Sequence, residues 1–189
     1  HSYEPDQEKS IKNFPFRYLV HNYFPIPKES LVVNIASLDD GIYTRSKIHI
    51  KNSIDFCKRI GAELYTFHPG FVNDPRGANL GEENYDFRFE HKTITLEIYQ
   101  RAFQRMLSAI REIMDYAKKN RIKIAIETEG SISKKDYLLM QKPEEYKILF
   151  QSFNPEEIGI SLNVGHLILA SKAHHFEMDE LVDLVADKI

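Results

Sequence analysis

The sequence contains a single cysteine, Cys57, so no disulfide can form within the chain. So low a count is typical of proteins kept in a reducing compartment. No apolar run approaches the roughly 20 residues that a membrane-spanning helix needs. Residues 1–12 are polar and lack the apolar segment of a signal peptide. We therefore expect a cytoplasmic protein with no membrane partner.

An excess of charge of one sign is also missing. The chain has 25 basic and 28 acidic residues, which gives a formal net charge of −3. Nucleic acid is bound largely through neutralised phosphates, so this balance disfavours a nucleic-acid partner without excluding one. The sequence has no phosphate-binding glycine loop, no serine nucleophile turn and no Cys-x-x-Cys pair. The chemistry must therefore come from other side chains.

The composition is that of one globular domain. Hydrophobic residues make up 42% of the chain and charged residues 28%, which is ordinary for a folded protein. No stretch rich in glycine, serine or proline is long enough to act as a linker, and no internal repeat is visible. We therefore treat residues 1–189 as a single domain.

Short apolar runs alternate along the chain with longer amphipathic segments. The apolar runs predict strands at 16–20, 64–67, 122–126 and 158–162. The amphipathic segments predict helices at 45–60, 98–117, 143–153 and 178–188. This alternation predicts an α/β fold with a parallel sheet, because each crossover between parallel strands needs a helix. Open doubly wound sheets and closed barrels both fit, and both collect active-site groups at the carboxyl ends of the strands.

Local signals mark several helix ends. Gly61 follows the first predicted helix as a stop signal, and Asn120 follows the longest apolar stripe as a predicted left-handed cap. Pro143 suits the first turn of the next helix. Cys57 lies on an apolar stripe, so we interpret it as a small buried side chain and not as a nucleophile. Residues 73–91 are polar and too long for an ordinary connector, so we expect a lid or binding loop there.

Each predicted strand runs into a polar side chain that can titrate or bind a metal. His21, His68 and Glu127 follow the first three strands, and Asn163 and His166 follow the fourth. Parallel strands place these ends on one face of the sheet, so we expect the side chains to meet in one polar pocket. Imidazole and carboxylate groups are ligands of zinc, manganese and iron, and they also serve in general acid–base catalysis.

Neighbouring residues carry further candidates. Pro69 and Gly70 fix a tight turn after His68, and Gly70 would let the backbone come close to a ligand. Asn22, beside His21, is either a substrate contact or a turn former. Glu129 is either a second acid–base group on the face of Glu127 or a plain loop residue.

At these positions the sequence resembles the xylose-isomerase-like barrel group, which includes sugar and sugar-phosphate isomerases and epimerases and endonuclease-IV-type nucleases. The resemblance rests on four ordered stretches spread over nearly the whole chain: Val20-His21-Asn22-Tyr23-Phe24, Phe67-His68-Pro69-Gly70, Ile124-Ala125-Ile126-Glu127 and Ile160-Ser161-Leu162-Asn163-Val164-Gly165-His166. The resemblance implies a (β/α)8 TIM barrel with a divalent metal, zinc or manganese, at its carboxyl face. We expect the barrel to be incomplete here, with about four βα units, because a full barrel takes about 250 residues.

The resemblance also implies roles for individual residues. In the nuclease branch the residues matching His21, His68, Glu127, Asn163 and His166 are metal ligands. In the epimerase branch the residue matching Glu127 binds the metal and transfers a proton, and the one matching His166 contacts substrate. We accordingly assign catalysis to Glu127 and His166, and metal binding to His21, His68, Glu127 and His166. Substrate binding is assigned to His68, Asn22 and Asn163.

One residue departs from the family pattern. Position 163 is Asn where the family normally has Asp, and a neutral amide is a poorer ligand for a transition metal than a carboxylate. The substitution is compatible with an altered metal site, with a metal-free binding role or with an engineered change.

Three functions follow as hypotheses. The leading one is a metal-dependent sugar or sugar-phosphate isomerase or epimerase, an enzyme that moves a proton next to a carbonyl. The first alternative is an endonuclease-IV-type phosphodiesterase acting on abasic DNA. The second is a non-catalytic sugar-binding barrel. The expected partner is a small sugar or sugar phosphate, and a homodimer is left open.

Overall fold

The computed structural model describes residues 5–27, 29, 31–76, 88–89, 93–131, 138–154 and 156–189. Its strands are β1 (Leu19–His21), β2 (Leu64–Phe67), β3 (Pro75–Arg76), β4 (Arg88–Phe89), β5 (Lys123–Glu127) and β6 (Gly159–Ser161). Its helices are α1 (Pro5–Lys12), α2 (Asp40–Ile60), α3 (Leu96–Asn120), α4 (Pro143–Ser152), α5 (Val164–His174) and α6 (Met178–Val185), followed by a 3-10 turn, η2 (Ala186–Lys188). Among these helices, none is long and apolar enough to cross a bilayer.

The main sheet has four parallel strands in the order β1-β2-β5-β6. These strands follow one another in space as they do in sequence, whereas a doubly wound sheet reverses its strand order at a switch point. The parallel sheet that the alternation predicts is therefore confirmed, and its order is that of consecutive barrel strands. The short pair β3 and β4 forms a separate antiparallel ribbon.

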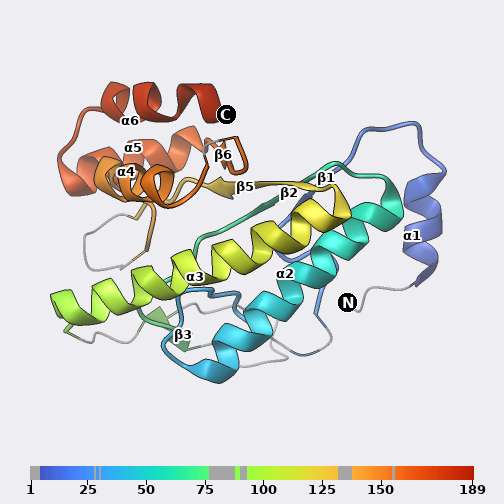
Figure 1. Ribbon diagram of the computed structural model, residues 1–189, viewed down its shortest axis with the longest axis horizontal. Coiled ribbons are helices and arrows are strands. Elements are labelled where there is room, and N and C mark those ends of the chain that lie inside the picture. Colours follow the sequence, from blue (N-terminus) through green and yellow to red (C-terminus); the bar gives the residue numbers. More distant parts are fainter. Residues whose placement is uncertain are drawn as a thin grey trace.

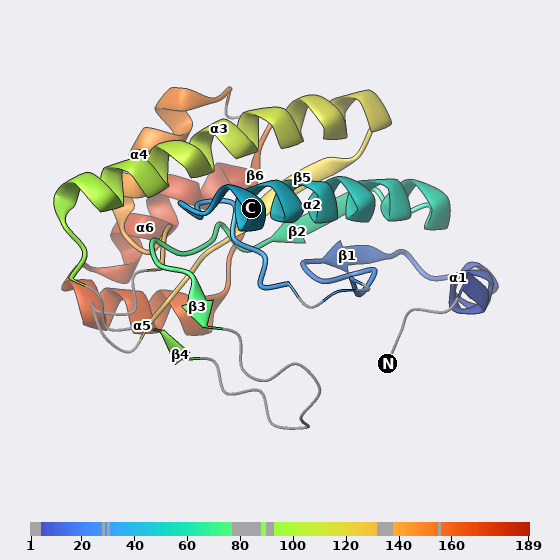
Figure 2. The same cartoon turned by 90° about the horizontal axis from the view of Figure 1, so that it is seen from below.

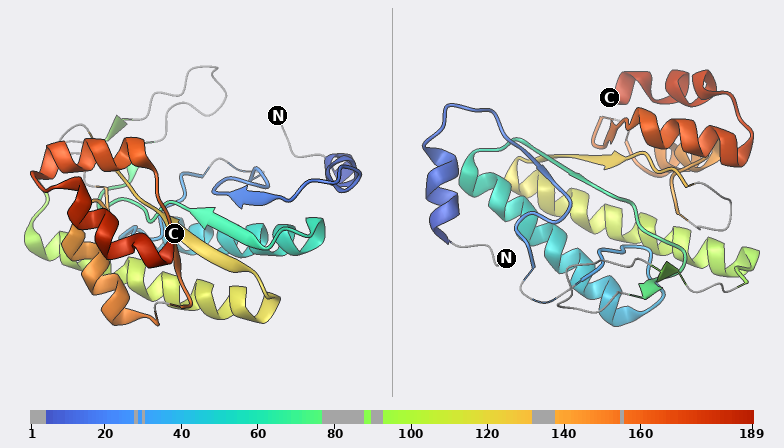
Figure 3. Two further views of the ribbon diagram at one scale, coloured as in Figure 1. Left: turned by 90° about the horizontal axis from the view of Figure 1, so that it is seen from above. Right: turned by 180° about the vertical axis from the view of Figure 1, so that it is seen from behind.

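Helices α2 and α3 run side by side along one face of the sheet (Figure 1). The strand residues facing them are buried and apolar, among them Val20, Tyr65, Phe67, Ile124, Ile126 and Ile160. Turning the molecule shows both helices on the same side of β2 and β5 (Figure 2). Helix α1 lies at one end of the molecule, and α5 and α6 lie at the other (Figure 3). The core therefore fills the space between sheet and helices.

The opposite face of the sheet is lined by small and polar side chains. Because side chains alternate along a strand, Thr66, Ala125 and Ser161 point away from the helices. They line a hollow of about 450 Å³ together with Leu19, which is 55% exposed. In a barrel of this class, that face is the interior.

The positions of the helix ends are set by capping residues more than by the apolar pattern. Helix α2 begins at Asp40, before the predicted start, because the Asp39 side chain accepts a hydrogen bond from Ile42 N. Gly61 ends α2 in the left-handed conformation at φ 76°, as predicted. The prediction for Asn120 is wrong: Asn120 is still helical and its side chain donates to Tyr116 O, while Arg121 takes the left-handed position at φ 59°.

Helix α5 was not predicted, and the strand bounds shift by a few residues. The first strand was placed at 16–20 but is Leu19–His21, so His21 belongs to the strand itself. The third runs through Glu127, one residue beyond its predicted end. The fourth is Gly159–Ser161, within its predicted range.

Gly70 has close neighbours within the chain. Its φ of 108° favours glycine, and a Cβ there would meet the Asn34 side chain and the backbone of Ile35. The approach of this backbone to a ligand stays a prediction. Asn34 donates to Asp74 Oδ1 at 2.7 Å, and its side-chain oxygen accepts from Phe71 N at 2.9 Å. Ser37 donates to Asp74 Oδ2 at 2.6 Å. Gly70 therefore lets the loop after β2 close onto the loop after β1.

Candidate functional site

The structure brings the strand-end side chains together at the carboxyl edge of the sheet. His21 ends β1, His68 directly follows β2, and Glu127 ends β5. One ligand atom from each of these three residues lies within 4.8 Å of the other two. The rings of His21 and His68 meet edge to face with centroids 5.1 Å apart, and the His166 ring lies 6.2 Å from that of His68.

Glu127 occupies the centre of this cluster. Its Oε2 lies 3.6 Å from His21 Nδ1, and its Oε1 lies 3.7 Å from His166 Nδ1. Oε1 also accepts a hydrogen bond from Asn163 Nδ2 at 2.9 Å. Oε1 of Glu127 is thus held by the Asn163 amide, while Oε2 faces His21.

His68 and His21 have different electrostatic surroundings. His68 Nδ1 is 2.5 Å from Glu129 Oε1. Burial alone would lower the pKa of His68, but the hydrogen bond and charge of Glu129, with the charge of Glu127, outweigh burial and raise that pKa. Burial lowers the pKa of His21, and the neighbouring His68 lowers it further against the opposing charges of Glu127 and Glu129. His21 Nδ1 also lies 2.8 Å from Thr66 Oγ1.

The ring orientation of His166 is fixed by the backbone. Its Nδ1 lies 2.7 Å from the carbonyl oxygen of Thr128. A carbonyl can only accept, so Nδ1 carries the proton and, in the neutral ring, Nε2 carries a lone pair. His166 lies beside the cluster formed by His21, His68 and Glu127, and its Nε2 is available to accept a hydrogen bond.

Both ends of the Asn163 side chain are in use. Its Nδ2 donates to Glu127, and its Oδ1 accepts from His166 N at 3.2 Å as the N-cap of α5. The backbone N of Asn163 donates to Thr128 Oγ1 at 2.8 Å. Asn163 therefore links β5, the fourth strand end and the start of α5 in one network.

Asn22 follows His21 in the left-handed conformation, with φ 42°. Its backbone N donates to Thr66 O at 2.8 Å, and its carbonyl accepts from Tyr65 OH at 2.8 Å and His49 Nε2 at 3.1 Å. Its side-chain Oδ1 is buried, and no described residue bonds to it. Asn22 thus shapes the turn, and its assignment to substrate binding stays a prediction.

Some contributors were not singled out from the sequence. Thr66 contacts His21, and Thr128 anchors both Asn163 and His166. Thr66 lies two residues before His68 and so shares its face of the strand, which is the signal that would have found it. Thr128 acts through its backbone oxygen as well as its hydroxyl group. A contact through a backbone oxygen can hardly be predicted from the residue type.

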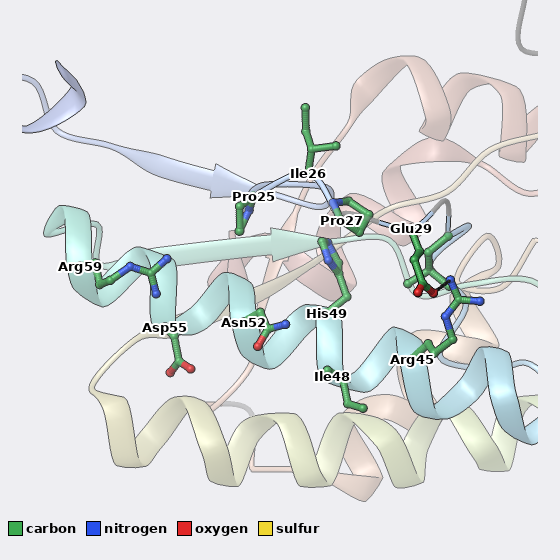
Figure 4. Close-up of a pocket in the computed structure, with 11 residues that line it drawn as sticks. Pro25, Ile26, Pro27, Glu29, Arg45, Ile48, His49, Asn52, Asp55 and Arg59 are labelled. Atoms are coloured by element: carbon green, nitrogen blue, oxygen red, sulfur yellow. Dashed lines mark ion pairs between the residues drawn. The ribbon is translucent and has the colours of Figure 1, made fainter. Parts of the chain in front are cut away.

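The predicted lid at 73–91 lies mostly outside the described residues. Its described parts are residues 73–76, which include β3, and β4. A separate pocket of about 700 Å³ lies between the loop after β1 and helix α2 (Figure 4). Pro25, Ile26 and Pro27 line one side, and His49, Asn52 and Asp55 line the helix side. None of the candidate site residues lines this pocket.

The donor set fits a divalent metal. Zinc binds histidine nitrogen and carboxylate oxygen at about 2.0 to 2.2 Å, so ligands of one ion lie no more than ~4.4 Å apart. The ligand atoms of His21, His68 and Glu127 lie within 4.8 Å of one another, which is close to this limit. The structure thus offers two imidazoles and one carboxylate, and His166 lies beside them.

Comparison with known proteins gives the family. The xylose isomerase-like TIM barrel family matches residues 6–189, so the chain belongs to this family. A comparison with curated proteins gives no match.

Solved structures share the fold at low identity. A D-tagatose 3-epimerase-like protein is 17% identical with a TM-score of 0.70, and the match covers 98% of this chain and 58% of that one. A Clostridium cellulolyticum D-psicose 3-epimerase, solved with D-tagatose, is 12% identical with a TM-score of 0.63 and coverages of 100% and 67%. A Thermus thermophilus protein soaked with zinc chloride is 15% identical with a TM-score of 0.58 and coverages of 87% and 53%. The chain thus spans little more than half the length of the D-tagatose 3-epimerase-like protein and of the Thermus thermophilus protein.

Proposed function

We propose that the protein is a metal-dependent sugar epimerase or isomerase, acting on a free sugar or a sugar phosphate. The observation that supports this most is the meeting of His21, His68 and Glu127 at the carboxyl edge of the sheet. A D-tagatose 3-epimerase-like protein, a D-psicose 3-epimerase and an L-ribulose 3-epimerase are among the structures that share the fold. In a barrel of this kind, the carboxyl edge is where substrates bind.

The proposal gives each side chain a task. His21, His68 and Glu127 would hold the ion, zinc or manganese. A divalent metal at this position would polarise the substrate carbonyl and so acidify the neighbouring carbon. Glu127 would take the proton from that carbon and, in an isomerase, deliver it to the neighbouring carbon. In an epimerase, a second acid on the opposite face of that carbon would have to supply the returning proton. His166, whose Nε2 has a lone pair, would accept a hydrogen bond from a sugar hydroxyl.

Proton exchange tests the proposal directly. The purified protein is incubated with zinc or manganese and D-tagatose or D-fructose in D₂O, and deuterium uptake next to the carbonyl is followed by NMR. We expect uptake by the wild-type protein and none by Glu127→Gln. Glu144→Gln is the matched control, since Glu144 is exposed on α4, and it should exchange like wild type. Substantial exchange by a folded Glu127→Gln protein would contradict the assignment.

A nuclease is the second candidate. The observation favouring it is the presence of both His21 and His68 in the cluster, since both match metal ligands in the endonuclease-IV-type branch. The net charge of −3 counts against it, because duplex binding depends on phosphate neutralisation. Incision of an abasic duplex that a chelator abolishes would support this function over the first. If the protein neither exchanges protons nor incises DNA, and binds a sugar without any metal, the non-catalytic function remains.

A further inference from the structure

We propose that Glu129 is a positioning residue of the metal centre, which holds the ring of His68 by Nδ1 so that Nε2 is presented to the ion. This inference rests on the proposed metal centre. The sequence leaves Glu129 open as an acid–base group or a plain loop residue, and a positioning residue is neither of these.

The first support is the geometry of the His68 ring. Nδ1 lies 2.5 Å from Glu129 Oε1. The two ring nitrogens of an imidazole lie on different sides of the ring, so a bond at Nδ1 leaves Nε2 as the ligand atom. Metal-binding histidines commonly donate their other N–H to a carboxylate in this way, which fixes the tautomer and strengthens the ligand.

The second support is how firmly Glu129 is held. Its backbone N donates to Met140 O at 3.2 Å, which ties it to the segment leading into α4. On its other side, Gly130 packs so closely on the backbone of His166 that a Cβ there would overlap the His166 carbonyl. Glu129 is therefore fixed between two elements, as a residue that orients another must be.

The third support is charge. The Glu129 side chain is 7% exposed, and its ion-pair partners among the described residues are His68 and, at 3.9 Å, His166. No lysine or arginine of the described residues pairs with it. A buried carboxylate needs compensation, and a cation on the far side of the His68 ring would supply it. With Oε1 engaged and little exposure, Glu129 is poorly placed to reach a substrate.

Zinc affinity tests the proposal. The affinity of the wild-type protein for zinc alone is measured by competition with a chromophoric chelator and compared with that of Glu129→Gln. Loss of such a supporting carboxylate costs about 10- to 100-fold in metal affinity. We expect a loss of this size. Glu145→Gln is the matched control, because Glu145 is also a buried, hydrogen-bonded carboxylate but contacts Tyr99 and the start of α4. It should bind zinc like wild type.

A double-mutant cycle separates positioning from general support of the fold. If Glu129 acts through His68, Glu129→Gln should cause no further loss of zinc affinity in a His68→Ala background. An equal loss in both backgrounds would overturn the proposal. In the wild-type protein, ¹⁵N NMR of His68 should show the proton on Nδ1, and an Nε2–H tautomer would also overturn it. This measurement needs only the wild-type protein, so it tests the proposal even if the variants do not fold.

The outcomes distinguish this inference from the proposed function. Unchanged zinc affinity in Glu129→Gln overturns the role of Glu129 and leaves the epimerase proposal intact. Zinc binding that depends on Glu129, in a protein that exchanges no proton of any sugar, supports the inference and overturns the epimerase. A wild-type protein that binds neither zinc nor manganese overturns both.

Discussion

Single residues at the site do more than one task, and Asn163 is the clearest case. A carboxylate at position 163 would lie beside that of Glu127, and the two would repel. The amide instead donates to Glu127 Oε1 at 2.9 Å and caps α5 with its oxygen. The Asp that the family pattern has at this position is thus replaced by an amide that holds the candidate ligand Glu127.

Two substitutions separate the tasks of Asn163. Asn163→Ser keeps a capping oxygen but loses the donor to Glu127, so we expect zinc affinity to fall by roughly 10-fold with little change in stability. Asn163→Ala also loses the cap, which should cost a further ~1 kcal/mol of the free energy of unfolding. Chelator competition and urea unfolding measure the two effects. Wild-type zinc affinity in Asn163→Ser would show that the amide donor is unimportant.

His49 gives a pH dependence of stability. Burial lowers its pKa below the ordinary 6.5, against a hydrogen bond to Asn22 that opposes the shift. Below pH 6.5 the unfolded chain therefore binds a proton at His49 that the folded protein does not, so this residue costs stability as pH falls toward its folded pKa. Gln at this position can still donate to Asn22 but does not titrate.

We therefore expect His49→Gln to lose less stability than wild type between about pH 7.5 and about pH 5.5, the interval over which the unfolded histidine gains its proton. Urea unfolding of both proteins at the two pH values measures this. The contributions of His21 and His68 are common to both proteins and cancel in the comparison. Equal losses would mean that His49 is free to take up a proton in the folded state.

The strand-end residues could be found in the sequence because each interrupts an apolar run, as His68 does after β2. The partners of these residues could not be found in the same way. Whether Glu129 contacts His68 or turns to solvent depends on the backbone path after β5, and no local pattern encodes that path. The contact between Gly70 and Asn34 could not be predicted either, because the two residues are distant in sequence.

At the scale of elements, sequence patterns worked where one face of a helix is apolar. The β2 bounds were predicted correctly, as was the apolar stripe of α3. Helix α5 escaped notice because its apolar residues face several directions. Leu167 and Ala170 are buried, while Val164, Ile168 and Leu169 are exposed, so the helix shows no single stripe. Its start is instead set by the Asn163 cap.

The contact between Gly130 and α5 is the element-scale feature most sensitive to change. A methyl group at Gly130 would overlap the His166 backbone, so α5 must move away from β5. We expect Gly130→Ala to lower the free energy of unfolding by roughly 3 kcal/mol or more. Gly61→Ala is the control. Gly61 has a positive φ but open space around it, so the cost should be about 1 kcal/mol. Similar losses in thermal or urea unfolding would contradict the close packing.

At the scale of the whole molecule, β1 and β6 are the outer strands of the described sheet. Among the described strands, β1 pairs only with β2, and β6 only with β5. The inner face carries the hollow beside Leu19. Exposed strand edges promote pairing between chains.

We therefore expect the 189-residue chain to associate as its concentration rises. Leu19→Lys, which puts a charge on the β1 edge, should weaken this association in sedimentation velocity experiments. Leu96→Lys, at an exposed position on α3, should not. A monomer at all concentrations would show that the edges are protected in solution.

The spread of the candidate ligands over β1, the turn after β2, and β5 has a thermodynamic consequence. A denatured chain holds His21, His68 and Glu127 far apart, so it offers no comparable binding site, and zinc would bind the native state almost exclusively. Ligand binding of that kind adds RT ln(1 + [L]/Kd) to the stability. The melting temperature should then rise steadily with the concentration of free zinc. This rise would show that the chain has folded even if the zinc-bound protein does not act on a sugar.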